Sequence, residues 1–337
     1  MQDDAMLIGI AVSPTAGKGT ASTVGTELAR ALRAAGQQVI ELSATGLAEM
    51  HITVDCAVHA GLGALVVVGG DGIVHLGIQS VAQTGIPLGI VPVGTGNDFA
   101  ACAGIPLRTD RAIEALVAAL TSGASAREVD LLRVTGAGLN GSTAQWVAGS
   151  VSAGLDAAVN ARANRMRWPH GPLRYVVAAL LEILRYRSWS YRVRMEGVAL
   201  APPQRAEMEQ FPGMRVGDAG VDRSVTWKQR GALMTVANAA TLGGGIRIAP
   251  RAELDDGYAD VVVAQDVGRL TAARLFPLLV VGRHLRSKRL RCVPARMVHI
   301  ASGGPREAAP PVYGDGEWLG TLPVQVEVRS RALRLVV

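Results

Sequence analysis

A continuous apolar run, Ala64-Leu65-Val66-Val67-Val68, leads directly into Gly69-Gly70-Asp71-Gly72. Such a run is typical of a strand that is buried on both faces, as in a parallel sheet covered by helices. The same order recurs where the predicted strand Leu88 to Val91 ends at Pro92-Val93-Gly94-Thr95-Gly96-Asn97-Asp98-Phe99. Strands alternate with helical segments through about residue 125, which predicts a parallel α/β fold for this part of the chain.

The pattern changes beyond about Val129. Longer strands, several of them alternating, are predicted at 145–152, 191–196, 233–239, 259–264, 297–301 and 324–328, with helices at about 173–187 and 269–286. They indicate a β-rich, antiparallel second domain over residues 129–323. The first domain is predicted at 1–128, and the C-terminal strand, about 324–337, is expected to return to it. Residues 201–227 are rich in Pro and charge and are interpreted as a loop or insertion.

Both glycine-rich segments can hold an anion. Glycine lets backbone N–H groups approach a phosphate closely, and the helix that follows adds a partial positive charge. A carboxylate in each segment, Asp71 and Asp98, suits a site that also holds Mg²⁺ or a nucleophilic hydroxyl. Parallel sheets place their ligands at such strand ends. The plainer interpretations are an Asp-Gly turn at Asp71 and a helix cap by Asn97 or Asp98.

These two segments resemble the diacylglycerol kinase catalytic domain family, which includes bacterial lipid kinases and sphingosine kinases. The first is similar to the family's GGDGT, and the second matches its PxGTGNDFA in full. Residues 160–171 resemble the corresponding stretch of actinobacterial diacylglycerol kinases. Further resemblances, in chain order, are Asn238, Gly243-Gly244-Gly245, Pro250, Asp255-Asp256-Gly257 with Asp260, and Gly314-Asp315-Gly316-Glu317. The markers run from Ser13 to Pro323, nearly the whole chain.

The resemblance implies an NAD kinase-like or diacylglycerol kinase-like α/β domain, a β-rich second domain, and ATP and Mg²⁺ as cofactors, with ATP lying between the two domains. It implies that nucleotide and phosphates are held by Ser13, Gly17, Gly69, Gly70, Gly72, Gly94, Thr95, Gly96 and Asn97. The implied catalytic residues are Asp71, Asp98, Asp315 and Glu317, with Asp315 as the favoured base and Glu317 linked to Asp98 and Asp71. The implied metal ligands are Asp71, Asp255, Asp256 and Asp260. Without the resemblance, Asp315-Gly316 would be interpreted as a hairpin turn, and residues 255–260 as an acidic turn between strands.

One segment departs from the family pattern. The family usually has Thr-x-Asn-Glu after GGDG, whereas this chain has Ile73-Val74-His75-Leu76. Ile73 has no hydroxyl to donate to a phosphate, so a lower rate is expected if that bond is needed, although backbone donors could suffice. His75 is expected on a helix surface.

The net charge of +6 favours anionic partners. Basic residues surround Trp168 (Arg162, Arg165, Arg167, His170, Arg174) and form a second run (Arg283, His284, Arg286, Lys288, Arg289, Arg291). Beside apolar helical segments they suit an anionic membrane interface, although solvated faces are the plainer interpretation of each run. Three scattered cysteines indicate a reducing compartment and no zinc site. With no secretory leader and no transmembrane helix expected, we predict a cytoplasmic, peripherally membrane-associated protein.

The favoured function is an ATP-dependent lipid kinase that converts diacylglycerol to phosphatidic acid. Alternative acceptors are a sphingoid base, ceramide, monoacylglycerol or a prenol, because apolar channels discriminate poorly between chains. Two further hypotheses are a soluble NAD kinase-like enzyme and a non-catalytic nucleotide- or lipid-binding relic. No signature of nucleic-acid binding is present. The oligomeric state is left open, a homodimer included.

Overall fold

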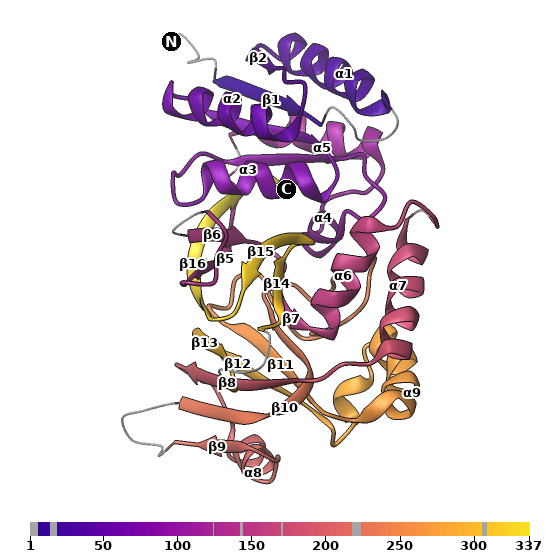
Figure 1. Ribbon diagram of the computed structural model, residues 1–337. Coiled ribbons are helices and arrows are strands. Elements are labelled where there is room, and N and C mark those ends of the chain that lie inside the picture. The colour runs from indigo at the N-terminus through magenta and orange to yellow at the C-terminus, as the bar shows by residue number, and fades with distance from the viewer. Residues whose placement is uncertain are drawn as a thin grey trace. The chain divides into compact units, whose positions relative to one another are not determined.

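The computed structural model describes residues 6–13, 19–123, 125–141, 144–169, 171–217, 224–304 and 309–337. The chain divides into two compact units (Figure 1). The first contains Met1–Leu131 and Arg331–Val337, and the second contains Leu132–Ser330. Two strands, β5 (Arg127–Thr135) and β16 (Val324–Leu335), carry the chain from one unit to the other. No helix in the described ranges is both long enough and apolar enough to span a bilayer.

The first unit is a parallel sheet with helices on both faces. Its strands β1 (Leu7–Val12), β2 (Gln38–Leu42), β3 (Ala64–Gly69) and β4 (Leu88–Pro92) pair in the order β2-β1-β3-β4, all parallel. The end of β16 pairs in parallel with β4 through Leu335 and Leu88. Every residue of β3 is buried, as the apolar run predicts.

Helices α1 (Thr20–Ala34) and α5 (Thr109–Thr121) pack with the side chains of Val66 and Val68 in one core. Helices α2 (Leu47–His59) and α3 (Asp71–Val81) contact each other and the opposite face. There a Cβ on Gly77 of α3 would lie only 2.9 Å from Cγ1 of Val67, so glycine allows the close approach of helix and strand. A short helix, α4 (Asp98–Cys102), follows β4.

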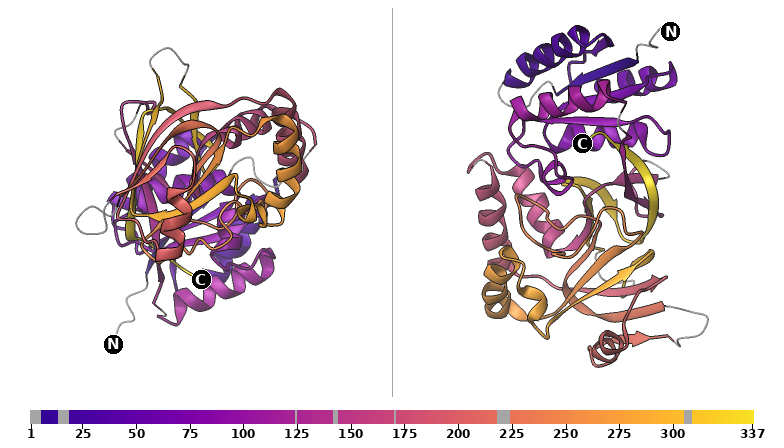
Figure 2. Two further views of the ribbon diagram at one scale, coloured as in Figure 1. Left: turned by 90° about the horizontal axis from the view of Figure 1, so that it is seen from below. Right: turned by 180° about the vertical axis from the view of Figure 1, so that it is seen from behind.

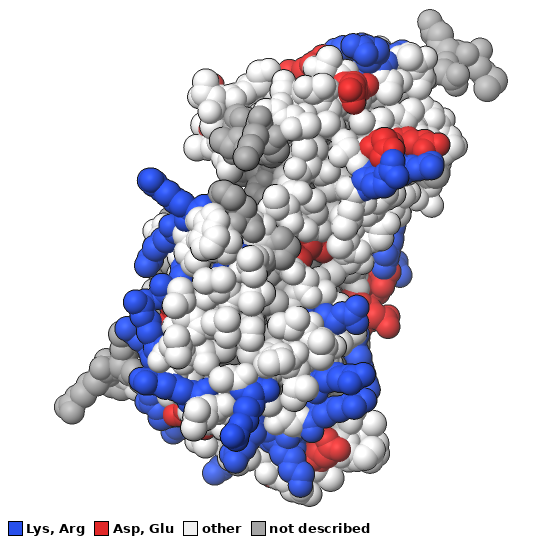
Figure 3. All heavy atoms as spheres, turned by 90° about the vertical axis from the view of Figure 1, so that its right-hand side faces the viewer, with Lys and Arg blue, Asp and Glu red and all other residues white. Residues whose placement is uncertain are grey.

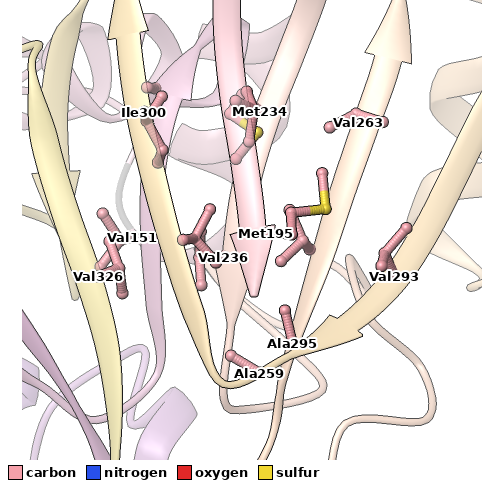
Figure 4. Packing of buried hydrophobic residues seen from close by; sticks show 14 of the residues in the cluster. Val151, Met195, Met234, Val236, Ala259, Val263, Val293, Ala295, Ile300 and Val326 are labelled. Atoms are coloured by element: carbon pink, nitrogen blue, oxygen red, sulfur yellow. The ribbon is translucent and has the colours of Figure 1, made fainter. Parts of the chain in front are cut away.

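The second unit is dominated by antiparallel pairing. Its strands are β6 (Ala144–Val147), β7 (Ser150–Gly154), β8 (Trp189–Glu196), β9 (Met214–Val216), β10 (Ser224–Ala237), β11 (Ala259–Gln265), β12 (Leu290–Ala295), β13 (Met297–Ser302), β14 (Pro311–Gly314) and β15 (Glu317–Thr321). The long strand β10 pairs with β8 along its first half and with β7 along its second half. Residues such as Met195, Met234 and Ile300 interlock in the core (Figure 4). The predicted fold class is confirmed.

Helices α6 (Leu155–Arg165), α7 (Pro172–Arg185) and α9 (Gly268–Val280) belong to the second unit. Helix α7 contacts both α6 and α9. All three views place α7 and α9 along the same side of this unit (Figures 1 and 2). The helix predicted at 269–286 ends earlier, at Val280, and a 3-10 turn follows at His284–Arg286. The second basic run therefore crosses this turn and enters β12. The sequence analysis did not predict this strand.

Residues 201–227 were predicted as a loop or insertion; the loop is wrong for the described residues, and the insertion stays a prediction. This stretch contains α8 (Pro202–Glu209), β9 and the start of β10, while 218–223 lie outside the described residues. Phe211 and Trp227 are both buried, and the Trp227 ring stacks on Tyr191 with 5.8 Å between centroids. The error arose because these apolar residues are spaced without a helical or strand period, although they still pack on the sheet.

Candidate active site

The two glycine-rich segments lie beside each other because β3 and β4 are parallel neighbours. Gly69 at the end of β3 is in register with Pro92 at the end of β4, and the N–H of Val93 donates to the Gly69 carbonyl at 2.9 Å. Ser13 follows β1, the other neighbour of β3, and its N–H donates to the Val68 carbonyl at 2.9 Å. The sheet thus brings three of the predicted nucleotide-binding segments to one edge.

Gly70 and Gly94 are in backbone contact. A Cβ on Gly94 would lie 2.6 Å from Cα of Gly70 and 2.7 Å from Oδ1 of Asn97. No real Cβ tolerates such distances, so Gly94 requires glycine for steric reasons, whereas a Cβ on Gly70 would lie 3.3 Å from Cα of Gly94, a tight contact. Thr95 at the tip of the second segment is exposed. The arrangement leaves backbone groups and the Thr95 side chain as the available contacts for a ligand.

Asn97 connects the two segments. Its N–H donates to Oδ2 of Asp71 at 2.9 Å, and its Nδ2 donates to the Gly94 carbonyl at 2.9 Å. Asn97 has φ 56° and ψ 37°, a left-handed conformation that asparagine adopts more readily than most residues. Its side chain is only 9% exposed, and its Oδ1 has no hydrogen-bond partner among the residues described.

Asp71 and Asp98 point toward the same small space. A Cβ on Gly96 would lie 2.6 Å from Oδ2 of Asp71 and 3.9 Å from Oδ2 of Asp98. These carboxylate oxygens, and Oδ1 of Asn97, the residue before Asp98, are candidate metal ligands. Oxygen ligands from one or two carboxylates, completed by substrate phosphates and water, are what Mg²⁺ takes in phosphoryl-transfer sites. The residues present therefore fit this ion.

The remaining predicted residues of the first unit have different surroundings. Ile73, in the first turn of α3, is 1% exposed, so its side chain is buried within the protein. His75 is half-buried on the same helix, with its Nε2 3.4 Å from Nε2 of Gln79. Gly17 lies outside the described residues, as does His170 of the first basic cluster.

Asp315 holds a turn of the second unit. Its carboxylate accepts hydrogen bonds from the N–H groups of Ala148, Gly149 and Ser150 at 2.8, 2.8 and 3.1 Å. The Gly149 N–H and Ser150 N–H share Oδ1, whereas Oδ2 accepts the Ala148 N–H. Asn238 fixes the same turn from its carbonyl side, because its Nδ2 donates to the Ala148 carbonyl at 2.9 Å. Asp315 itself has φ 49°, as expected for a residue in a tight turn.

Helix α6 supports the Asp315-Gly316 turn. Nδ2 of Asn164 donates to the Gly316 carbonyl at 2.8 Å, a contact that the sequence did not predict. Glu317 is exposed. Burial raises the pKa of the Tyr313 phenol, while the nearby charges of Arg165 and Glu317 lower and raise that pKa respectively. Glu317 belongs to the second unit and Asp71 and Asp98 to the first, so their predicted network stays a prediction.

Asp255 and Asp256 lie in a turn before β11, whereas Asp260 lies within β11. Asp255 and Asp256 are exposed, and Oδ1 of Asp256 accepts the N–H of Tyr258 at 2.8 Å. Burial raises the pKa of Asp260, and burial with the nearby Asp260 raises the pKa of the Cys292 thiol. Within the described ranges, no group of three or more acidic, His or Cys side chains is placed to hold a metal ion. Metal binding at Asp255, Asp256 and Asp260 stays a prediction.

Asp156 is a buried acid that the sequence analysis missed. It begins α6, accepts the Ala157 N–H at 3.0 Å on Oδ1, and accepts the Thr235 hydroxyl on Oδ2. Burial raises its pKa to about 6. It borders an apolar cavity of about 60 Å³ whose walls include Val159, Tyr175, Ile183, Leu233, Phe276 and Leu279. The signal available in the sequence was an acid inside the apolar run 150–159.

Two family models match the chain. Residues 8–134 match the diacylglycerol kinase catalytic domain, and residues 149–337 match the YegS C-terminal NAD kinase beta sandwich-like domain. The first range includes every predicted nucleotide-binding residue. The second includes Asp156, Asn238, Asp315 and Glu317. Both ranges lie in the order that the sequence markers predict.

Individual proteins give the same result. A protein named diacylglycerol kinase from Mycobacterium tuberculosis (strain H37Rv) is 31% identical over 324 residues, which cover 96% of this chain and 93% of the relative. A Stenotrophomonas maltophilia protein named "Probable lipid kinase YegS-like" is 28% identical, over 64% of this chain and 61% of its own. A solved diacylglycerol kinase structure from Bacillus anthracis shares the fold, with a TM-score of 0.63, 17% identity, and coverage of 98% of this chain and 96% of its own.

Proposed function

The chain belongs to the diacylglycerol kinase family of lipid kinases, and on that premise we propose that it transfers the γ-phosphate of ATP to the hydroxyl of diacylglycerol, giving phosphatidic acid. ATP-dependent phosphorylation of an alcohol follows from the family itself. The choice of diacylglycerol rests on one observation: the 31% identity, over 96% of the chain, to a protein named diacylglycerol kinase.

An apolar acceptor is also supported by the second unit. The cavity beside Asp156 is lined almost entirely by aliphatic and aromatic side chains from α6, α7, α9 and β10. Apolar walls suit a hydrocarbon, because burial of apolar surface contributes about 25 cal/mol per Å². At about 60 Å³ the cavity is well below the roughly 300 Å³ of a ligand pocket, so an acyl chain would enter it only if α7 and α9 moved apart.

The first unit is assigned to the nucleotide. Backbone N–H groups of the segments at Gly69–Gly72 and Gly94–Gly96 would bind phosphate oxygens, because their glycines have no side chain to cover the backbone. Asp71 and Asp98, with Oδ1 of Asn97, would hold Mg²⁺. When bound, the ion neutralises charge on the β- and γ-phosphates. The N–H of Asn97 keeps Asp71 oriented toward that position.

Asp315 is assigned as the general base. The acceptor oxygen forms a bond to the γ-phosphorus as the bond from that phosphorus to the β,γ-bridging oxygen breaks, and ADP leaves with the electron pair. The hydroxyl proton passes to the Asp315 carboxylate late in this step. The three backbone N–H groups that bond to it hold the carboxylate in one orientation.

The test is transfer of labelled phosphate from ATP, with Mg²⁺, to diacylglycerol, monoacylglycerol, ceramide, a sphingoid base and a prenol in anionic mixed micelles, with NAD as a soluble acceptor. Each reaction is run beside Asp315→Asn. Labelled phosphatidic acid from the wild type, lost in the variant, is the expected result. Product on another acceptor would overturn the choice of diacylglycerol. ATP binding without any product would favour the non-catalytic alternative.

A further inference from the structure

Helix α7 is apolar on two faces. Ala178, Ala179 and Ile183 are buried on the inner side, facing α6 and the cavity. The outer side carries Leu173, Leu180 and Leu184, which are 56%, 48% and 68% exposed. Their spacing of seven and four residues places them on one stripe of the helix. Helix faces that are apolar are ordinarily buried, so the outer stripe of α7 is expected to be covered by another surface.

Helix α9 repeats this arrangement. Leu275, Phe276 and Leu279 pack inward, whereas Leu270, Leu278 and Val281 are 77%, 40% and 57% exposed. Trp168, just before α7, is 77% exposed. We call the outer side chains of these two helices and Trp168 the α7–α9 face. Of the fifteen large hydrophobic side chains that are exposed in the described ranges, nine lie between Trp168 and Val281 on these two segments, so they are gathered and not scattered.

The charges around this face are predominantly positive, and its acids are Glu182 and the exposed Asp266, which lies just before α9. Residues 157–187 contain six arginines and one acid, Glu182, which pairs with Arg162. Residues 267–291 contain seven Lys or Arg and no acid. In Figure 3, where the side bearing α7 and α9 faces the viewer, Lys and Arg gather around an area of uncharged side chains over the second unit, with few acids among them. Arg167, Arg274, Arg286 and Lys288 are all exposed.

We propose that the α7–α9 face is the surface by which this protein docks on an anionic phospholipid bilayer, with the leucines and Trp168 entering the interface and the basic side chains contacting lipid headgroups. The proposal rests on the proposed lipid kinase function and names the partner that supplies its substrate. Exposed leucine and tryptophan beside arginine and lysine is the composition of interfacial membrane helices. Each basic residue near an anionic leaflet contributes about 1 kcal/mol.

Two features favour a bilayer over another occupant. A second copy of the chain on the same face would bring two sets of like charges together, which is unfavourable. The inner sides of α7 and α9 line the apolar cavity through Ile183 and Leu279. A lipid leaving the bilayer at this face would therefore have only the thickness of one helical layer to cross. A protein partner would have no need of that cavity.

The experiment is flotation of the purified full-length protein with vesicles of phosphatidylglycerol and phosphatidylcholine in equal parts, without ATP. Two combined variants test the face. The first carries Leu173→Gln, Leu184→Gln and Leu270→Gln, and the second carries Arg286→Glu and Lys288→Glu. We expect each to lower the apparent affinity for these vesicles at least about tenfold. Wild-type binding should weaken with salt and on vesicles of phosphatidylcholine alone. Because the altered side chains are exposed, the melting temperature should stay close to that of the wild type.

The chain offers matched controls. Leu47 and Ile52 on α2 are 41% and 65% exposed and Leu107 is 53% exposed, so Leu47→Gln with Ile52→Gln and Leu107→Gln replaces as many exposed apolar side chains elsewhere. Arg192 and Lys228 line a different basic region, an open groove of about 730 Å³ over β8, β10 and β13, so Arg192→Glu with Lys228→Glu reverses as many charges. Both controls should bind vesicles as the wild type does.

The proposal is overturned if the face variants bind as tightly as the wild type, if the controls lose as much, or if the wild type does not bind these vesicles. A wild-type dimer that the leucine variant converts to a monomer, with vesicle binding unchanged, also overturns it. Wild-type phosphorylation of diacylglycerol in detergent micelles is measured separately. If that reaction fails while vesicle binding still depends on the face, the proposed function is wrong and the docking surface stands.

Discussion

The backbone N–H of Asn97 donates a 2.9 Å hydrogen bond to Oδ2 of Asp71. This bond joins the segments that follow two neighbouring parallel strands. The carboxylate that we assign to Mg²⁺ is therefore oriented by the backbone that we assign to the phosphates. Such coupling suits a reaction whose catalysis consists largely of positioning and charge neutralisation.

Replacement of Asp71 separates charge from position. Asp71→Ala removes both the carboxylate and the acceptor for Asn97, whereas Asp71→Asn keeps an amide oxygen that can accept the same N–H. We expect both to lower turnover on the order of a thousandfold, because each lacks the negative charge. Calorimetry should show a free energy of unfolding within about 1 kcal/mol of the wild type. A folded and fully active Asp71→Ala protein would show that the site is misassigned.

Gly96 provides a test that removes no polar group. In Gly96→Ala the new methyl carbon would lie 2.6 Å from Oδ2 of Asp71, so the carboxylate or the loop must move. We expect weaker ATP binding and turnover lower by at least about tenfold, measured by titration calorimetry and the micelle assay. Gly46→Ala is the control, since Gly46 has φ −159° and open space around its Cβ position. Equal effects of the two changes would contradict the role given to Gly96.

The first unit was largely predictable from local sequence, because most of its strands are short apolar runs and the turns after β3 and β4 are marked by glycine. Its parallel pairing follows from the alternation of strand and helix, and β3 with Gly69 to Gly72 formed as predicted. The site was predictable to the same extent, because parallel pairing places the ends of β3 and β4 at one edge. Asn97 was predicted as a nucleotide-binding residue or a helix cap, but its backbone bond to Asp71 could not be inferred from spacing.

The second unit was less predictable because its contacts join residues far apart in the chain. Asp315 contacts residues 148–150, more than 160 positions earlier, and Asn164 contacts Gly316. No local period encodes such pairs. Asp156 was missed for another reason: an acid inside an apolar helix start resembles a cap in the sequence, and only burial distinguishes it. The 201–227 segment was misassigned because its side chains pack on the sheet without a regular spacing.

Ile73 was expected to affect the rate through a missing hydroxyl, and its position in the core gives a different prediction. Ile73→Thr places a hydroxyl where the structure has packed aliphatic groups, so we expect a loss of about 1–3 kcal/mol in the free energy of unfolding and no gain in turnover. Ile73→Val, which only shortens the side chain, should cost about 1 kcal/mol. Urea denaturation and the micelle assay measure the two effects. A more active Ile73→Thr protein would show that this side chain reaches the phosphates.

Asp156 makes stability depend on pH. Burial raises the pKa of this carboxyl from 3.8 to about 6 in the folded protein, so the folded state binds the proton more tightly than the unfolded state. Its contribution is therefore greatest below pH 3.8 and is lost as the pH rises through about 6, a change of about 3 kcal/mol in the free energy of unfolding. Asp156→Asn has no charge to gain and keeps partners for Thr235 and Ala157, because the Thr235 hydroxyl can rotate to accept.

The difference between the unfolding free energies of Asp156→Asn and the wild type isolates this carboxyl from all others that titrate. We expect the variant to gain stability relative to the wild type as pH rises from 4 to 7, most of it below pH 6.5, with a plateau above that. Asp255→Asn, which changes an exposed carboxyl, controls for net charge and should show no such gain. A difference that is flat over this range would mean that Asp156 is ionised at little cost, and that the cavity beside it is wetter than its apolar walls indicate.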